Sequence, residues 1–366
     1  MMFHFPPFKH VQYINDRPAP RFDLARSNIT PDWTGVLEDG LDLSYLGASD
    51  PKGLSDLSEH LGNAYGTDPS RVVVTNGTSE ANWLSYISLV GPGSKVLIEK
   101  PIYTPLLEIP AALGCKVRTI KRRAPDFRFD LKELAQRFEK GVDLFVVQNH
   151  NNPTGKALYE DDLHDIARLA ERHKVPILCD EVYRDFAMDF DEGVPRNAFP
   201  SMAEVSDRAV ITSSVTKVYG AGGAVAGWMV APKRTADRAR QMKIYTTPMV
   251  NHQGNRLALG ILRNRHKVMP KELSDLREKL RLVSTWANGR EDVIWSEPDG
   301  AAIGFLMYRH RMSSIDACER LYNEFEVRCI PGAFFHQEHG FRLGLGRPYD
   351  EIKGALKRID EFLDGL

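Results

Sequence analysis

Short apolar runs alternate with amphipathic stretches in the middle of the chain. The runs are rich in Val, Ile and Leu, and they occupy residues 71–75, 95–98, 144–147, 175–179, 209–212 and 227–230. Helical patterns lie between them, as in the face formed by Leu163, Ile166, Ala167 and Ala170. Continuous apolar strands separated by helices are typical of a mainly parallel sheet that is covered on both faces. The pattern therefore predicts an α/β core.

The two ends of the chain predict a second, smaller unit. The pattern after about residue 255 is mostly helical, and the last helix carries an apolar stripe of Ile352, Leu356, Ile359 and Phe362. We place the large domain at residues 42–255. The small domain, of α+β type, then consists of residues 1–41 together with residues 256–366.

The charge balance narrows the class of ligand. The 366 residues contain 48 Lys and Arg against 49 Asp and Glu, and the two signs are interspersed, so we expect no surface for nucleic acid or a membrane. No apolar run reaches the ~18 residues of a spanning helix, and the N-terminus lacks the pattern of an export signal. Four scattered cysteines without a CxxC pair argue against a zinc site and a disulfide framework. We expect a cytoplasmic protein that binds a small molecule and no metal.

The residues that follow each predicted strand carry the candidate chemistry, because ligands of open parallel sheets bind beyond the carboxyl ends of the strands. The first strand leads into Gly77, Thr78 and Ser79 at the start of a helix. Free backbone N–H groups and the helix dipole suit a phosphate at such a position. An ordinary helix cap explains these residues equally well when they are taken alone.

The next two strands are followed by an aromatic residue and an amide. Tyr103 follows the second strand and could cover a flat aromatic ligand, although a lone loop tyrosine is more often packing. Asn152 lies in an amide-rich stretch after the third strand and is followed by Pro-Thr-Gly. Turn formation is the alternative explanation for Asn152.

The last two strand ends supply opposite charges. Asp180 and Tyr183 follow the fourth strand, and a carboxylate beside an apolar sheet is costly unless it meets a cation. Ser214 and Lys217 follow the fifth strand and precede a glycine-rich segment. A lysine in that place can be desolvated and kept as a neutral nucleophile, whereas most lysines are solvated surface residues.

Taken together, the five strand ends provide a phosphate cradle, an aromatic cover, an amide, a carboxylate and a lysine. Pyridoxal 5'-phosphate needs an anion site for its phosphate, a lysine that forms a Schiff base with its aldehyde, and an acidic partner for its ring nitrogen. The joint occurrence outweighs the separate alternatives. We predict pyridoxal 5'-phosphate as the cofactor.

The motifs also carry a family resemblance. With Asn-Pro-Thr-Gly at 152–155, Asp-Glu-Val-Tyr at 180–183 and Ser-Val-Thr-Lys at 214–217, the chain resembles fold type I pyridoxal-phosphate enzymes, specifically class I/II aminotransferases. The resemblance runs from about Tyr45 to Arg342. It implies a mainly parallel seven-stranded sheet flanked by helices and a homodimer with active sites near the subunit interface.

The resemblance implies a role for each motif residue. It assigns the phosphate to Gly77, Thr78, Ser79 and Ser214, ring stacking to Tyr103, the ring hydroxyl to Asn152 and Tyr183, the ring nitrogen to Asp180, and the Schiff base to Lys217. Arg342, within Phe-Arg-Leu-Gly-Leu at 341–345, is expected to bind the substrate α-carboxylate bidentately, and Asn152 is expected to help bind the substrate.

Two positions depart from the family pattern. The family usually places an arginine eight residues after the lysine to neutralise the phosphate, and this chain has Val225 there. The segment around Tyr45 has an unusual spacing, so a role for Tyr45 at the neighbouring subunit's phosphate is only a hypothesis. Residues that could face the substrate side chain are Arg26, Asn28, Lys243, Tyr245 and Asn251.

The expected reaction is amino transfer between an L-amino acid and a 2-oxo acid. Lys217 then acts as general base and acid on the α-proton, with Asp180 and Tyr183 as further catalytic residues. Three alternatives remain open from sequence: β-elimination on the same fold, a non-catalytic ligand-binding module, and a nucleotide-dependent oxidoreductase. The last is weak, because Val225 stands where a dinucleotide fingerprint needs its third glycine.

Overall fold

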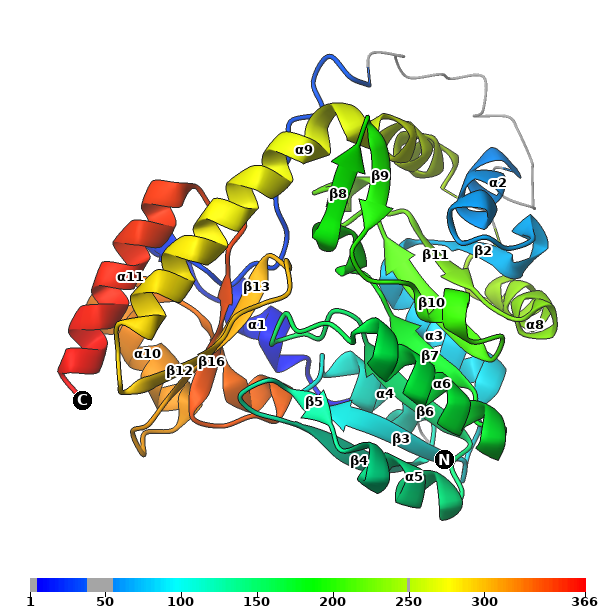
Figure 1. Cartoon of the computed structure of the whole chain (residues 1–366), viewed down its shortest axis with the longest axis horizontal. Coiled ribbons are helices and arrows are strands. Elements are labelled where there is room, and N and C mark those ends of the chain that lie inside the picture. The colour runs from blue at the N-terminus through cyan, green and yellow to red at the C-terminus, as the bar shows by residue number, and fades with distance from the viewer. Residues whose placement is uncertain (1–4, 38–54, 249–250) are drawn as a thin grey trace.

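A large mixed sheet forms the centre of the molecule (Figure 1). The computed structural model describes residues 5–37, 55–248 and 251–366. In spatial order the sheet contains β2 (Val72–Thr75), β11 (Gly227–Val230), β10 (Ala209–Ser214), β7 (Ile177–Asp180), β6 (Leu144–Gln148), β3 (Lys95–Lys100), β4 (Lys116–Arg123) and β5 (Arg128–Phe129). Strands β10, β7, β6, β3 and β4 are parallel, and β11 is antiparallel to both of its neighbours. The predicted seven-stranded α/β sheet is confirmed, and the two-residue β5 extends its edge.

Alternate residues of each strand pack against helices on opposite faces, which explains the continuous apolar runs. One face contacts α3 (Gly77–Leu89), α4 (Pro105–Ala112) and α8 (Lys233–Lys243) through residues such as Val73, Ile98 and Met229. The other face packs on α5 (Leu131–Glu139), α6 (Glu160–His173) and α7 (Met202–Val205) through residues such as Val74, Leu97 and Cys179. Both faces of the sheet are therefore covered, as predicted.

The C-terminal part contains more strand than its pattern indicated. After α9 (His252–Asn288), a four-stranded antiparallel sheet is formed by β12 (Val293–Ser296), β13 (Ile303–Tyr308), β16 (Gly340–Gly344) and β15 (Ile330–Pro331). Helices α10 (Ser314–Phe325) and α11 (Tyr349–Asp364) pack beside α9 and this sheet. The segment is mostly helical, as expected, and its short strands supply the β part of the predicted α+β unit.

The N-terminal segment runs beside this second sheet. It forms α1 (Lys9–Asn15) and β1 (Phe22–Asp23), and β1 pairs in parallel with β14 (Val327–Arg328). The remaining elements are α2 (Ser55–Ala64), the hairpin of β8 (Met188–Asp191) and β9 (Val194–Asn197), and the short helices η2 (Pro69–Arg71), η3 (Arg184–Ala187), η4 (Gly222–Ala224) and η5 (Gly332–Phe335). Among the helices described, none is both long and apolar enough to cross a membrane.

Candidate active site

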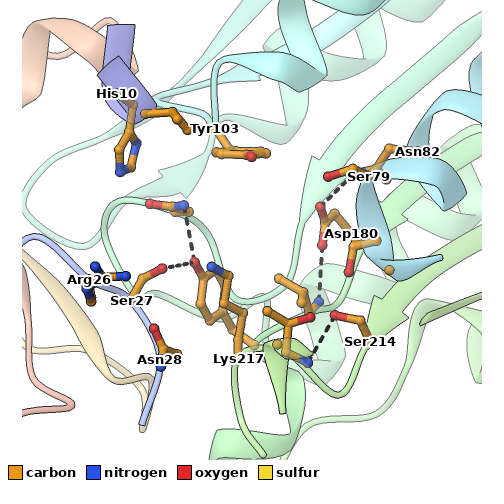
Figure 2. Close-up of a pocket in the computed structure, with 18 of the residues that line it drawn as sticks. His10, Arg26, Ser27, Asn28, Ser79, Asn82, Tyr103, Asp180, Ser214 and Lys217 are labelled. Atoms are coloured by element: carbon orange, nitrogen blue, oxygen red, sulfur yellow. Dashed lines mark hydrogen bonds between the residues drawn. The ribbon is translucent and has the colours of Figure 1, made fainter. Parts of the chain in front are cut away.

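A cavity of about 370 Å³ lies where the ends of the large sheet strands meet the N-terminal segment and β16. Every motif residue singled out from sequence within the described ranges lines it or touches a residue that does. Figure 2 shows Asp180 and Asn82 on one side of the cavity and the segment that carries Arg26, Ser27 and Asn28 on the other. The fold thus brings together residues that are up to 265 positions apart, from Gly77 to Arg342.

The start of α3 forms one end of the cavity. Asn76, the N-cap residue, makes no capping hydrogen bond with its side chain, so the first N–H groups of α3 remain available to an anion. Oγ1 of Thr78 is buried and has no hydrogen-bond partner in the described part of the chain. A Cβ at Gly227 would lie 2.7 Å from Cα of Gly77, so glycine at 227 permits the close packing of α3 on β11. This end has the donors that a phosphate requires.

The carboxylate of Asp180 lies deep in the cavity and is held by defined donors. Nδ2 of Asn82 donates to its Oδ2 over 3.1 Å, and the backbone N–H of Val182 donates to Oδ1 over 3.1 Å. Thr212 donates from Oγ1 to Oδ1 of Asn82 over 2.6 Å and so fixes the orientation of that amide. Burial raises the pKa of Asp180 to about 6, against these hydrogen bonds and the charge of Lys217.

Lys217 is held in the loop that follows β10. Its carbonyl accepts a hydrogen bond from the backbone N–H of Ile29, and Oγ of Ser214 accepts one from the N–H of Thr216 over 3.3 Å. Burial, and then the cation of Arg342, lowers the pKa of Lys217 to about 8, although Asp180 acts in the opposite direction. The amine is therefore more easily kept neutral than a surface lysine.

A tyrosine and an amide are hydrogen-bonded to each other in the middle of the cavity. Nδ2 of Asn152 donates to the hydroxyl oxygen of Tyr183 over 3.3 Å, and that hydroxyl donates to Oγ of Ser27 over 3.0 Å. Tyr103 is fixed through its backbone N–H, which donates to Oε1 of Gln148 over 3.1 Å. These contacts fix the side chains of Asn152 and Tyr183 and the backbone of Tyr103 around the cavity.

Arg342 is a buried cation whose hydrogen-bond partners among the described residues are all uncharged. It is 1 % exposed on β16, and its Nη1 donates to Oδ1 of Asn152 over 3.0 Å. Its Nη2 contacts the carbonyl oxygen of Ala25 and Nε2 of His10. Burial lowers its pKa to about 10, so it stays protonated at neutral pH. Within the described part of the chain no carboxylate pairs with it, which makes this a site for an anionic ligand.

Comparison with known proteins identifies this arrangement. The family model "Aminotransferase class I and II" matches residues 23–359. The chain belongs to this aminotransferase family. A sequence relative is the aspartate aminotransferase of Thermotoga maritima, 26% identical over 86% of this chain and 83% of the relative. The capreomycidine synthase of Streptomyces vinaceus is 27% identical over 80% of this chain and 74% of the relative.

Solved structures agree on the fold of this aminotransferase. A PLP-dependent aminotransferase from Streptococcus suis has a TM-score of 0.89, with 24% identity, and the match covers 99% of this chain and 98% of that one. The predicted family, enzyme class and cofactor are thereby confirmed: the protein is a PLP-dependent aminotransferase that acts on amino acids and 2-oxo acids. Its residues fit the cofactor, because an uncapped helix start, a half-buried lysine and a buried carboxylate line one cavity.

Sequence reasoning missed several residues of this aminotransferase site. Asn82 is a mid-helix residue, and only its position on α3, one turn after the phosphate cradle, could have indicated it. Ser27 lies in an N-terminal segment that follows β16 closely, because Gly344 and Gly346 leave room for it: a Cβ at either would lie within 2 Å of the carbonyl oxygen of Arg26 or Asn28. His10 lines the same cavity from α1.

The two departures from the family pattern have different outcomes. Val225 lines the cavity in the left-handed region, with φ +48°. Tyr45 lies outside the described residues, so its proposed role stays a prediction. Of the five residues considered for the substrate side chain, Arg26 and Asn28 line the cavity. The other three do not: Lys243 pairs with Glu80, Tyr245 is 91% exposed, and Asn251 caps α9.

Proposed function

We propose that Lys217 carries the pyridoxal phosphate of this aminotransferase and that the cavity selects acidic amino acids. The observation that carries the proposal is that the half-buried Lys217, the buried Asp180 and the buried, unpaired cation Arg342 line one cavity. The bound cofactor supplies an aromatic ring that accepts electron density from the substrate α-carbon when its ring nitrogen is protonated. A non-catalytic module has no need of this combination of groups.

Each residue has a defined task in the proposed reaction. The first N–H groups of α3, with Thr78 and Ser214, bind the phosphate, and Tyr103 covers the ring. Asp180 holds the proton on the ring nitrogen, and the hydrogen bond from Asn82 keeps its carboxylate ionised.

The substrate is held and deprotonated by the opposite side of the cavity. Arg342 binds the α-carboxylate and so aims the α-proton at Nζ of Lys217, whose lowered pKa of about 8 suits it to take and return that proton near neutral pH. Asn152 links the two ends of the site, because it touches both Arg342 and Tyr183.

The charges of the cavity favour a second carboxylate on the substrate. Its charged lining residues are Arg26, Lys217, Arg342 and Asp180, and Asp180 is committed to the cofactor. Arg26 directly follows Ala25, whose carbonyl is held by Arg342, and both arginines line the cavity. Several sequence relatives are named aspartate aminotransferase, which agrees with an acidic donor.

A donor panel tests the substrate class. Purified enzyme is mixed with one amino donor: L-aspartate, L-glutamate, L-alanine, L-phenylalanine or L-arginine. The acceptor is oxaloacetate when the donor is L-glutamate, and 2-oxoglutarate for every other donor. We expect the highest kcat/KM with an acidic donor, and we expect Arg26→Ala to remove that preference while neutral donors keep their rates. Arg21→Ala is the matched control, since Arg21 lies outside the cavity and packs on Phe22. A preference for L-arginine, or ammonia release without an acceptor, would contradict the proposal.

We also propose that the enzyme is a homodimer. Ile244 and Tyr245 are 63% and 91% exposed, and Leu257 and Val225 are also exposed although all four are apolar. Burial against a second copy would remove them from water. Phe8 of the N-terminal segment does not belong to this exposed set, because it packs against Tyr103 of its own chain with ring centroids 5.5 Å apart. Sedimentation of a stable, active monomer at micromolar concentration would contradict the dimer.

A further inference from the structure

His10 lies at the substrate end of the cavity and belongs to none of the sequence motifs. It sits in the first turn of α1, is 8% exposed, and lines the cavity together with Arg342 and Lys217. Figure 2 shows it descending from α1 beside Tyr103. Its ring packs edge-on against Phe335, with centroids 5.5 Å apart, and lies 5.7 Å from the ring of Phe8.

The contact between His10 and Arg342 defines the protonation state of the imidazole. Nη2 of Arg342 and Nε2 of His10 are 3.3 Å apart. A guanidinium can only donate, so Nε2 accepts and the ring proton resides on Nδ1. Burial lowers the pKa of His10 well below its usual value, and the charges of Arg342 and Lys217 lower it further. His10 is therefore a neutral acceptor beside a cation.

The same residue is a poor choice for packing alone. Nδ1 of His10 is buried and has no hydrogen-bond partner among the described residues, and an unpaired buried donor costs stability. The ring stands between Phe8 and Phe335, where a phenylalanine would fill the space without an unpaired donor. Keeping a histidine in this position therefore serves its contact with Arg342 rather than the core.

We propose that His10 is a positioning residue for the α-carboxylate site. Arg342 is held by three uncharged acceptors: Oδ1 of Asn152, the carbonyl oxygen of Ala25 and Nε2 of His10. These acceptors fix the direction of the guanidinium but leave its charge uncompensated for the substrate. A carboxylate in place of His10 would orient Arg342 equally well and would neutralise it. The inference rests on the proposed role of Arg342.

Helix α1 is anchored firmly enough to act as this support. Nη1 of Arg328 donates to the carbonyl oxygen of Ile14 over 2.9 Å, and the same guanidinium forms a buried ion pair with Asp23 over 2.7 Å. Tyr13 contacts the carbonyl oxygen of Cys318. The position of His10 is thereby tied to the strand β14 and helix α10, which flank the sheet that carries Arg342.

Three substitutions separate the acceptor from the bulk of the ring. His10→Phe keeps the volume and removes both nitrogens. His10→Gln places an amide oxygen where Nε2 stands, whereas His10→Asn reaches only the position of Nδ1. Gln12→Ala, on the exposed side of the same helix, controls for effects on α1. All are compared as holoenzymes, through the absorbance of the cofactor.

The probes are L-aspartate, 3-aminopropanoate, which lacks the α-carboxylate, and α-methyl-L-aspartate, which binds but has no α-proton to lose. His10→Phe is expected to raise the KM for L-aspartate and the Kd for α-methyl-L-aspartate about tenfold, the size of one hydrogen bond, with a much smaller change in kcat. The slow reaction with 3-aminopropanoate should keep its rate. His10→Gln should restore most of the binding, and His10→Asn should not.

The outcomes separate this inference from the proposed function. If the wild-type enzyme converts L-aspartate and His10→Phe binds it equally well, or if 3-aminopropanoate loses as much as L-aspartate, His10 does not position Arg342. Equal behaviour of His10→Gln and His10→Asn contradicts the role of Nε2 even if His10→Phe does not fold. If the wild-type enzyme binds no amino acid at all, the role of Arg342 itself fails.

Discussion

Asn82 and Asp180 form a buried pair in which the amide Nδ2 donates to the carboxylate Oδ2 over 3.1 Å. Burial raises the pKa of Asp180 to about 6, and the bond from Asn82 opposes that rise because it stabilises the ionised carboxylate. Asn82→Leu should therefore raise the pKa of Asp180 further. Since the ionised form holds the proton on the cofactor ring, the acid limb of the kcat profile should move to higher pH.

The same substitution should also lower stability, because Thr212 donates to Oδ1 of Asn82 over 2.6 Å and would lose its acceptor. The loss should be about 1–3 kcal/mol in the free energy of unfolding. Ser85→Ala, one turn along α3 and outside the cavity, is the control for the pH profile. An unchanged acid limb in Asn82→Leu would show that Asn82 does not support Asp180.

Arg342→Ala should weaken the binding of every amino acid alike, because the α-carboxylate is common to all of them. Loss of a buried charge partner costs roughly 2 kcal/mol or more, which is about 30-fold in binding. The measurement is KM for neutral and acidic donors, with kcat followed separately. An effect restricted to acidic donors would move Arg342 from the α-carboxylate to the substrate side chain.

The rate at which the apoprotein captures pyridoxal phosphate should rise with pH and level off above about 8. Only the neutral amine of Lys217 can attack the aldehyde, and burial together with Arg342 lowers the pKa of Lys217 to about 8. The neutral form therefore predominates above that value and is lost below it. Stopped-flow absorbance between pH 6 and 10 measures the profile. A midpoint near ~10.4, that of a solvated lysine, would contradict the desolvated site.

Val225→Arg should tighten cofactor binding. The cation beside the phosphate-binding start of α3 is Lys243, but its charge is shared with Glu80. Oε2 of Glu80 also accepts a hydrogen bond from the N–H of Asn76. A guanidinium at 225 would add a charge-assisted bond worth about 1–3 kcal/mol. The test is a cofactor titration of the apoproteins at fixed salt, with Val225→Gln as an uncharged control. Unchanged or weaker binding would mean that another cation already compensates the phosphate.

Local signals made the large sheet and the cofactor end of the site predictable. Strands such as β6 and β7 are buried on both faces and appear as continuous apolar runs, and the order of strands and helices then places Lys217, Asp180 and Asn152 at one edge. Asp180 is the last residue of β7, and Asn152 and Lys217 lie within four residues of the ends of β6 and β10. Topology alone brings them together, without knowledge of side-chain packing.

The substrate end could not be predicted in the same way, because it depends on contacts between distant parts of the chain. His10 and Ser27 reach the cavity only because the N-terminal segment runs along β16, with hydrogen bonds such as that from the N–H of Gly344 to the carbonyl oxygen of Leu24. No periodicity in the sequence marks that contact. The strands β14 and β15 gave no sequence pattern for a related reason, since they have two residues each.

The most direct test of the account is to find which lysine carries the cofactor. Purified holoenzyme is reduced with borohydride, which fixes the bond between the cofactor and its lysine, and its peptides are then mapped by mass spectrometry. We predict a single pyridoxyl-phosphate adduct on the peptide that contains Lys217. We predict no adduct on the corresponding peptide of Lys217→Ala treated in parallel. Lys243, which is buried, serves as an internal control that should remain unmodified. A stoichiometric adduct on any other lysine, or full cofactor retention by Lys217→Ala after reduction, would contradict the central claim.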